Sequence, residues 1–216
     1  VATAVRAHAN LNPRSTMFER PMTRDDYMEA RWISEPLCLY DNCLESDGAV
    51  AVVLVSERRA RDCRRPGVYI HACSQGLSRG HQVMTDYHSE NPLMGTAWAV
   101  ASNLWRQSDF GPGDVKVAQL YDAFTPLILF SLEAYGFCRV GEAADFVAGG
   151  ALAPGGRLPV NTSGGSLSEA YIHGMNLVTE GVRQLRGDST SQVEGADVCL
   201  VTSAAAVPGS ALLLRN

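Results

Sequence analysis

The chain has 216 residues, of which 46% are hydrophobic and 19% are charged, so it can form a packed core and is not disordered as a whole. Eighteen Lys and Arg against 23 Asp and Glu give a formal net charge of −5, which does not favour binding to nucleic acid. Because there is no apolar run of about eighteen residues and no secretory leader, we expect no membrane span and a cytoplasmic location.

The six cysteines are interpreted as reduced and mostly buried thiols. Their number is even, but the chain is too long for a small disulfide-dense domain. No C-x-x-C pair and no matching pair of histidines is present, so we expect no metal site.

The first part of the chain contains one helix signal and one strand signal. The opening residues 1–21 are interpreted as an arm, and Thr23 and Asp26 then form a T-x-x-D helix start. The apolar, β-branched run 49–56 (AVAVVLVS) predicts a fully buried strand.

A charged connection follows and ends in a Pro-Gly break at Pro66, which predicts a domain boundary. We therefore expect residues 1–66 to be the tail of one domain and residues 67–216 to form the next.

Strands and helices alternate after that boundary, which implies a mixed α/β sheet covered by helices. Strands are predicted over 67–74, 116–122, 196–203 and 210–216, and helices over 92–108, 125–136, 141–150 and 166–186. The last helix has the strongest signal, because Ser166 and Glu169 fit an S-x-x-E capping box ahead of an amphipathic pattern.

Polar residues gather at two points of the sequence, one at the end of a predicted strand and one beside a pair of glycines. Residues 120–125 (LYDAFT) end a strand and begin a helix, and ligands collect at the carboxyl ends of strands in α/β sheets. Residues 161–165 (NTSGG) precede the long helix, where glycines permit close backbone approach and free N–H groups favour negative charge. From this second point we expect substrate contacts by Asn161, Ser163, Gly164 and Gly165.

The sequence at these points resembles a known family. Residues 160–187 (VNTSGGSLSEAYIHGMNLVTEGVRQLRG) look like the C-terminal signature of thiolase-superfamily lipid-transfer proteins, and residues 44–57 (LESDGAVAVVLVSE) look like the end of the N-terminal thiolase half. YDAF at 121–124 stands where thiolases carry N-E-A-F, and GGSLSEAYIHG at 164–174 stands where they carry G-G-x-x-x-x-G-H-P-x-G. The resemblance covers essentially the whole chain. It implies a thiolase-like layered α/β fold with a mixed five-stranded sheet and helices, comprising the C-terminal half and the tail of the N-terminal half.

The departures from the thiolase motifs change the expected chemistry. The Asn and His positions that form the thiolase oxyanion hole are Tyr121 and Tyr171 here, and the C-terminal thiolase cysteine aligns with Ser203. None of the six cysteines has a thiolase-like context. A tyrosine pair in this register resembles the thiolase-like aldolases of sterol side-chain degradation.

That resemblance implies retro-aldol cleavage of a sterol-derived β-hydroxyacyl-CoA to a steroid ketone and a short acyl-CoA. Tyr121 and Tyr171 would be the acid/base pair, with the assignment of base and acid open. An unperturbed phenol has a pKa of about 10, so one of them needs help from a helix N-terminus, a cation or a proton relay.

Two neighbouring residues are expected to support the pair. Asp122 either orients its neighbour or caps the helix that follows. His173 is two residues after Tyr171, which would place it on the other side of a regular helix.

Two alternatives stay open: a catalytically degenerate thiolase-like protein that binds acyl-CoA or lipid, and a true acyl-CoA thiolase. No cofactor is expected, since coenzyme A would be present only in the substrate thioester. The resemblance further implies a homodimer and an OB-fold, acyl-CoA-associated partner protein.

Overall fold

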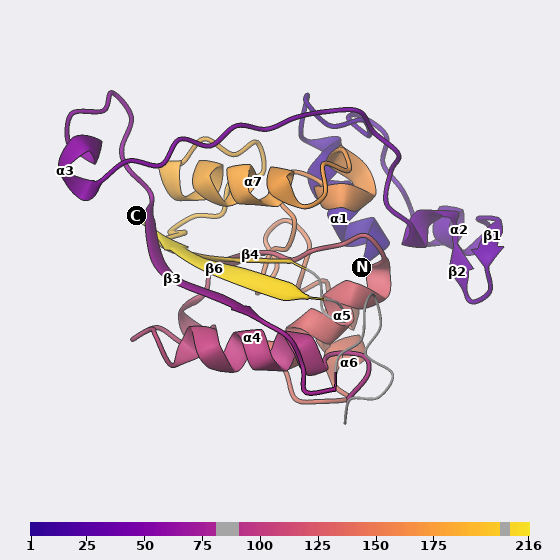
Figure 1. Cartoon of the computed structure of the whole chain (residues 1–216). Coiled ribbons are helices and arrows are strands. Elements are labelled where there is room, and N and C mark those ends of the chain that lie inside the picture. The colour runs from indigo at the N-terminus through magenta and orange to yellow at the C-terminus, as the bar shows by residue number, and fades with distance from the viewer. Residues whose placement is uncertain (81–90, 204–207) are drawn as a thin grey trace.

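The computed structural model describes residues 1–80, 91–203 and 208–216. A four-stranded mixed sheet in the order β3-β6-β5-β4 lies at its centre (Figure 1). The pairs β3–β6 and β6–β5 are antiparallel, and β5–β4 is parallel. The strands of this sheet are β3 (Tyr69–Gly76), β4 (Val117–Gln119), β5 (Val198–Thr202) and β6 (Gly209–Arg215).

The expected fifth strand is not formed in the described part of the chain. Beyond β4, Ala118 makes a single parallel bridge to Val160. The pairing cannot extend there because Pro159 has no N–H to donate and Asn161 turns the chain with a φ of 54°.

Helices cover both faces of the sheet, as the alternation of the sequence predicts. Figure 1 shows α4 and α7 on opposite faces, and β5 between them is buried along its whole length. This burial explains the uninterrupted apolar run of β5. The helices are α1 (Ala2–Asn10), α2 (Arg24–Met28), α3 (Glu57–Ala60), α4 (Gly95–Trp105), α5 (Thr125–Ala134), α6 (Ala143–Ala148) and α7 (Met175–Arg186), with 3-10 turns at Leu39–Asp41 and Pro112–Asp114.

The predicted helix over 166–186 is wrong in its first half. Residues Gly165–Glu169 form one π-helical turn, the chain is extended at Ala170, and α7 begins only at Met175. The capping box of Ser166 and Glu169 is not formed. Helical backbone cannot continue here because Gly164, Gly165 and Gly174 all have positive φ.

The opening residues are not an arm. α1 packs against the 165–169 turn, and His8 is fully buried between Ser191 Oγ, 2.6 Å from its Nδ1, and the Leu152 carbonyl, 2.9 Å from its Nε2. The alanine-rich sequence of this helix allows the close packing. α2 is capped by Thr23, which forms the predicted capping box with Asp26. The chain then forms a small hairpin of β1 (Trp32–Ser34) and β2 (Leu37–Cys38).

The predicted buried strand over 49–56 is also wrong. The segment is extended but unpaired with any described strand, and Val53 and Leu54 are 86% and 77% exposed. Its β-branched pattern is typical of a strand that pairs with neighbouring strands, and no described residues pair with it. The domain boundary near Pro66 stays a prediction.

The cysteines are all free, as expected, but most are not buried. Cys38 and Cys199 are buried, whereas Cys63 and Cys73 are exposed. Among the described residues, no helix combines the length and the apolar character needed to cross a bilayer.

Candidate functional site

Tyr121 lies just beyond the carboxyl end of β4, where the strand signal predicts a ligand site. Its backbone N–H donates to Thr202 Oγ1 (3.2 Å) at the end of the neighbouring parallel strand β5. Only 9% of the residue is exposed. The sheet therefore fixes the direction of this side chain.

Tyr171 reaches the same place from the loop before α7. The two phenol oxygens are 2.7 Å apart, which is a hydrogen bond, and the ring centroids are 6.5 Å apart. Tyr171 is partly exposed, and its backbone N–H donates to Ser46 Oγ (3.2 Å). The structure thus joins two tyrosines that are 50 positions apart in the sequence.

Burial distinguishes the two phenols chemically. Removal from water raises the pKa of Tyr121 above the ordinary value of 10, and the hydrogen bond with Tyr171 raises it further. Tyr121 consequently stays protonated at neutral pH and is available as a hydrogen-bond donor.

Asp122 does not cap α5, because the N-cap residue of this helix is Phe124 and no side-chain capping hydrogen bond is formed there. The carboxylate is fully buried and accepts the N–H groups of Ser166 (2.8 Å) and Leu167 (3.3 Å). Burial raises its pKa to about 6, against the lowering effect of those donors. Asp122 therefore ties the Tyr121 segment to the glycine-rich turn.

The four residues expected to contact substrate are buried. The Asn161 side chain bonds both the N–H and the carbonyl of Leu120, each at 2.8 Å. Ser163 Oγ donates to Glu169 (2.6 Å). A side chain added at Gly164 would overlap Ala9, and one added at Gly165 would overlap Asp122. These groups hold the two loops together, and their contact with substrate stays a prediction.

His173 is on the same side as Tyr171, not on the opposite side. The expectation assumed a regular helix, but the chain is not helical here and His173 itself has a φ of 49°. Its exposed ring lies 5.5 Å from the Tyr171 ring and 6.3 Å from the Tyr121 ring, measured between centroids. The next residue, Gly174, packs against the Tyr121 ring.

A segment that sequence reasoning missed connects both loops. Cys43 N–H donates to the Ala123 carbonyl (2.9 Å), and Leu44 N–H donates to the Ser166 carbonyl (3.0 Å). Ser46 then accepts the backbone N–H of Tyr171. Residues 43–46, which we name the strap, have no local motif, because their function in the fold depends on two distant loops.

Ser203, which aligns with the thiolase cysteine, is part of the connection between β5 and β6. Its Oγ accepts the N–H of Ser210 at 2.7 Å, and its own N–H donates to the Ser210 carbonyl at 2.8 Å. The hydroxyl is therefore already engaged by backbone.

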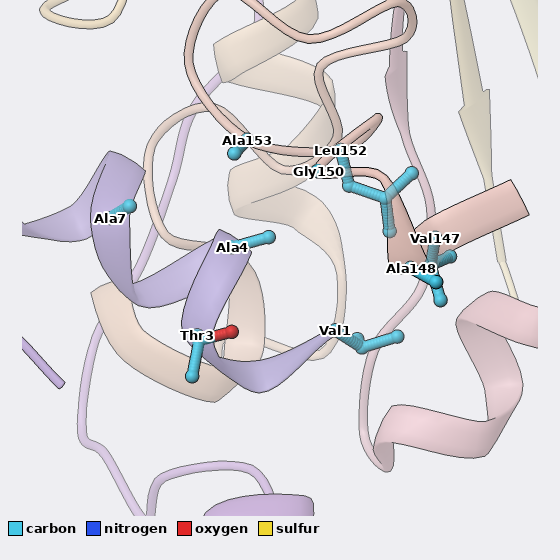
Figure 2. Close-up of a pocket in the computed structure, with 9 residues that line it drawn as sticks. All are labelled: Val1, Thr3, Ala4, Ala7, Val147, Ala148, Gly150, Leu152 and Ala153. Carbon is cyan, nitrogen blue, oxygen red and sulfur yellow. The ribbon is translucent and has the colours of Figure 1, made fainter. Parts of the chain in front are cut away.

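Cavities also lie elsewhere in the part of the chain that the structure describes. One of about 230 Å³ lies between α1, α6 and the 150–153 turn and is lined by small side chains, all apolar except Thr3 (Figure 2). A neighbour of about 420 Å³ extends toward Tyr27 and Asp41. Neither is lined by Tyr121 or Tyr171, so the tyrosine pair is a separate site.

Comparison with known proteins agrees with this architecture. Residues 79–213 match the model of the family described as thiolase C-terminal domain-like. The chain is 50% identical to 17-hydroxy-3-oxo-4-pregnene-20-carboxyl-CoA lyase of Mycobacterium tuberculosis over 99% of its own length and 56% of the relative. It is 47% identical to the steroid side-chain-cleaving aldolase of Thermomonospora curvata, again over 99% of the chain and 55% of the relative.

Among solved structures, the Ltp2-ChsH2(DUF35) aldolase superposes with a TM-score of 0.96 at 46% identity, covering 100% of this chain and 56% of that one. The chain thus spans little more than half the length of the relatives that it matches. Because the family match covers more than half of the chain, from before α4 into β6, the protein belongs to the thiolase C-terminal domain-like family.

Proposed function

We propose that the protein is a carbon–carbon lyase that cleaves a sterol-derived β-hydroxyacyl-CoA by a retro-aldol reaction. The products would be a steroid ketone and a short acyl-CoA. The observation that carries this proposal is the 2.7 Å contact between the hydroxyls of Tyr121 and Tyr171. The names of the two bacterial relatives support the same chemistry.

A retro-aldol reaction requires what two phenols can supply. A base removes the proton of the substrate hydroxyl, the bond between the α and β carbons breaks, and its electrons form the enolate of the thioester. A hydrogen-bond donor stabilises this enolate, and an acid then protonates its α carbon. We assign the donor and acid function to Tyr121, which burial keeps protonated, and the proton-accepting function to the more exposed Tyr171.

The alternative of a true thiolase needs an ionised cysteine at the site. Cys43 is near enough to Tyr121 to affect it electrostatically, but burial and the charge of Asp122 raise the pKa of the Cys43 thiol. A raised pKa makes it a poor nucleophile at neutral pH. Retro-aldol cleavage forms no covalent intermediate with the enzyme and needs no thiolate.

Buried polar groups would position the pair without contacting the reacting atoms. We infer this function for Asp122, Asn161 and Ser163, since their polar groups bond within the protein. Substrate would then approach from the exposed side of Tyr171. Contacts with the backbone of Gly164 and Gly165 stay part of the proposal.

The proposal includes a partner protein. The solved aldolase is named as a pairing of Ltp2 with ChsH2, and we infer a comparable partner here. An OB-fold in that partner, a homodimer of this protein and a cytoplasmic location are further parts of the proposal, supported by the resemblance.

One assay tests the function. The full-length protein and its partner are mixed with a tertiary β-hydroxyacyl-CoA of steroid type, and ketone release is followed. Tyr171→Phe is expected to lower kcat by about 10²- to 10⁴-fold, the usual range for losing an acid or base. Tyr69→Phe, a tyrosine of β3, is the matched control and should retain activity.

Three results would contradict the proposal. Full activity in correctly folded Tyr171→Phe would remove the phenol from the mechanism. Tight binding of the CoA ester without cleavage would favour the carrier alternative. Labelling of a cysteine that depends on acetyl-CoA would favour the thiolase.

A further inference from the structure

The tyrosine pair lacks a strong proton acceptor of its own. A phenol with an ordinary pKa of about 10 is about 0.1% ionised at pH 7, and Tyr121 is even less ionised because it is buried. Some neighbouring group must take a proton if Tyr171 is to accept one from substrate. This inference rests on the proposed function and concerns the source of that basicity.

Within the described ranges, one exposed imidazole lies at the pair, that of His173. His173, Tyr171 and Tyr121 form a three-ring cluster with centroid separations of 5.5, 6.3 and 6.5 Å. His173 is closest to Tyr171, the more exposed phenol. Imidazole is the side chain best suited to exchange protons near neutral pH.

The backbone holds His173 in this arrangement at an energetic cost. Its φ of 49° is in the left-handed region, which residues other than glycine seldom adopt. The preceding side chain, Ile172, packs at Gly48, and the following Gly174 packs on Tyr121. A strained residue kept between two such contacts is typical of functional sites.

We propose that His173 is the proton relay of the reaction and acts through Tyr171. The phenol proton of Tyr171 passes to the imidazole as the Tyr171 oxygen accepts the proton of the substrate hydroxyl. The α–β carbon bond breaks, the β carbon becomes the ketone, and the thioester enolate takes a proton from Tyr121 at its α carbon.

The 2.7 Å hydrogen bond between the phenols then closes the cycle. Tyr171 returns a proton to the Tyr121 phenolate, and the imidazolium returns its proton to Tyr171. All three side chains regain their starting states. In the net reaction, one proton moves from the substrate oxygen to the α carbon.

The effect of His173 on the pH profile must be distinguished from the effects of other titratable groups near the cluster. Asp122 and Cys43 both act electrostatically on Tyr121, and Glu45 acts on Cys43. Asp122 is the main competitor for an acidic pH limb, because burial raises its pKa to about 6. A test therefore needs separate variants of Asp122 and His173.

The test is a pH profile of kcat/KM with chemical rescue, on the full-length protein with its partner. His173→Gly suits the left-handed backbone, and it is expected to lower kcat/KM by about 10²-fold and to remove the acid limb of the profile. Added imidazole should raise the kcat/KM of His173→Gly about tenfold, but only while Tyr171 is present. His71→Gln is the matched control and should behave as wild type. His71 lies on β3 and pairs with Asp109.

Asp122→Asn should keep the acid limb. Retention of that limb in His173→Gly, or its loss in Asp122→Asn alone, would overturn the relay, as would a lack of rescue by imidazole.

A measurement without turnover separates this inference from the proposed function. The ring ¹⁵N resonances of His173, assigned by their absence in His173→Gly, should change in Tyr171→Phe and stay the same in Tyr69→Phe. Unchanged resonances would overturn the contact between His173 and Tyr171 even in an active enzyme. Changed resonances in a protein that cleaves no substrate would support the contact and contradict the lyase.

Discussion

The two tyrosines reach one site from segments that are built in different ways. Tyr121 follows a strand, and the sheet supports it through Thr202 at the end of β5. Tyr171 belongs to a glycine-rich loop that has one π-helical turn and is otherwise irregular, and other parts of the chain hold this loop in place. Asp122 binds the start of this loop, the strap binds its end, and α1 packs behind it.

This difference indicates where the site is vulnerable. The sheet holds the backbone of Tyr121, whereas the Tyr171 loop depends on a few contacts of side chains with backbone. Variants of those contacts should therefore separate the two halves of the site.

The contact of Asp122 should dominate the stability of the Tyr171 loop. Asp122→Ala leaves the buried N–H groups of Ser166 and Leu167 without a partner, which should lower the free energy of unfolding by about 2–5 kcal/mol. Urea unfolding measures this loss. Asp114→Ala, which removes an acceptor of one exposed N–H, is the control and should cost about 1 kcal/mol. Equal losses in the two variants would contradict the special position of Asp122.

The support behind the loop should weaken in acid through His8. Its folded pKa is lowered to about 4 by burial, below the ordinary 6.5, so the unfolded state binds more protons between these values. Stability should therefore fall by about 3 kcal/mol as pH drops from 6.5 to 4. Asp122 acts in the opposite direction, because its folded pKa is raised to about 6 and protonation stabilises the fold as pH falls from about 6 to about 4.

Two variants resolve these opposing contributions in urea titrations at several pH values. Against wild type, His8→Gln should lose less stability on acidification, and Asp122→Asn should lose more. The reverse order would show that neither buried group titrates as its environment implies.

Gly174→Ala should damage the site more than the fold. The added Cβ would lie 3.0 Å from the Tyr121 ring, and the φ of 82° adds about 1 kcal/mol of strain. Gly187→Ala is the matched control, since Gly187 has a φ of 73° with no atom within 4 Å of such a Cβ. Both should lose similar stability, and only Gly174→Ala should lower kcat, by about tenfold. Equal kcat values would contradict the contact with Tyr121.

The smallest effect is expected at the strap. Ser46→Ala removes the acceptor of the Tyr171 backbone N–H, which is only partly buried, and should cost about 1 kcal/mol or less. Thermal unfolding and kcat should both change slightly. A loss as large as that of Asp122→Ala would show that the strap, and not Asp122, is the main support of the loop.

The same contrast explains what the sequence could predict. The alternation of strands and helices after residue 66 is local, and it placed Tyr121 correctly at a strand end. The motif register paired Tyr171 with it. The capping pattern of Ser166 and Glu169 predicts a helix for the Tyr171 loop, whereas the Ser166 N–H donates to Asp122, 44 positions away, and Glu169 accepts from the Ser163 hydroxyl.

Other errors have the same origin. The predicted side of His173 rests on that incorrect helix, and the sequence does not predict α1 because an alanine-rich stretch gives little periodic signal. The run at 49–56 has the composition of a buried strand without a described partner. In each case the structure depends on contacts between distant residues, which a local pattern does not contain.

The central claim is that the two phenols act as one unit, and a double-mutant cycle on kcat tests it most directly. Tyr121→Phe and Tyr171→Phe should each lower kcat by about 10²- to 10⁴-fold, and the double variant should be little worse than the poorer single variant. Losses that multiply in the double variant would show that the hydroxyls work independently, and the account of a coupled acid/base pair would then be wrong.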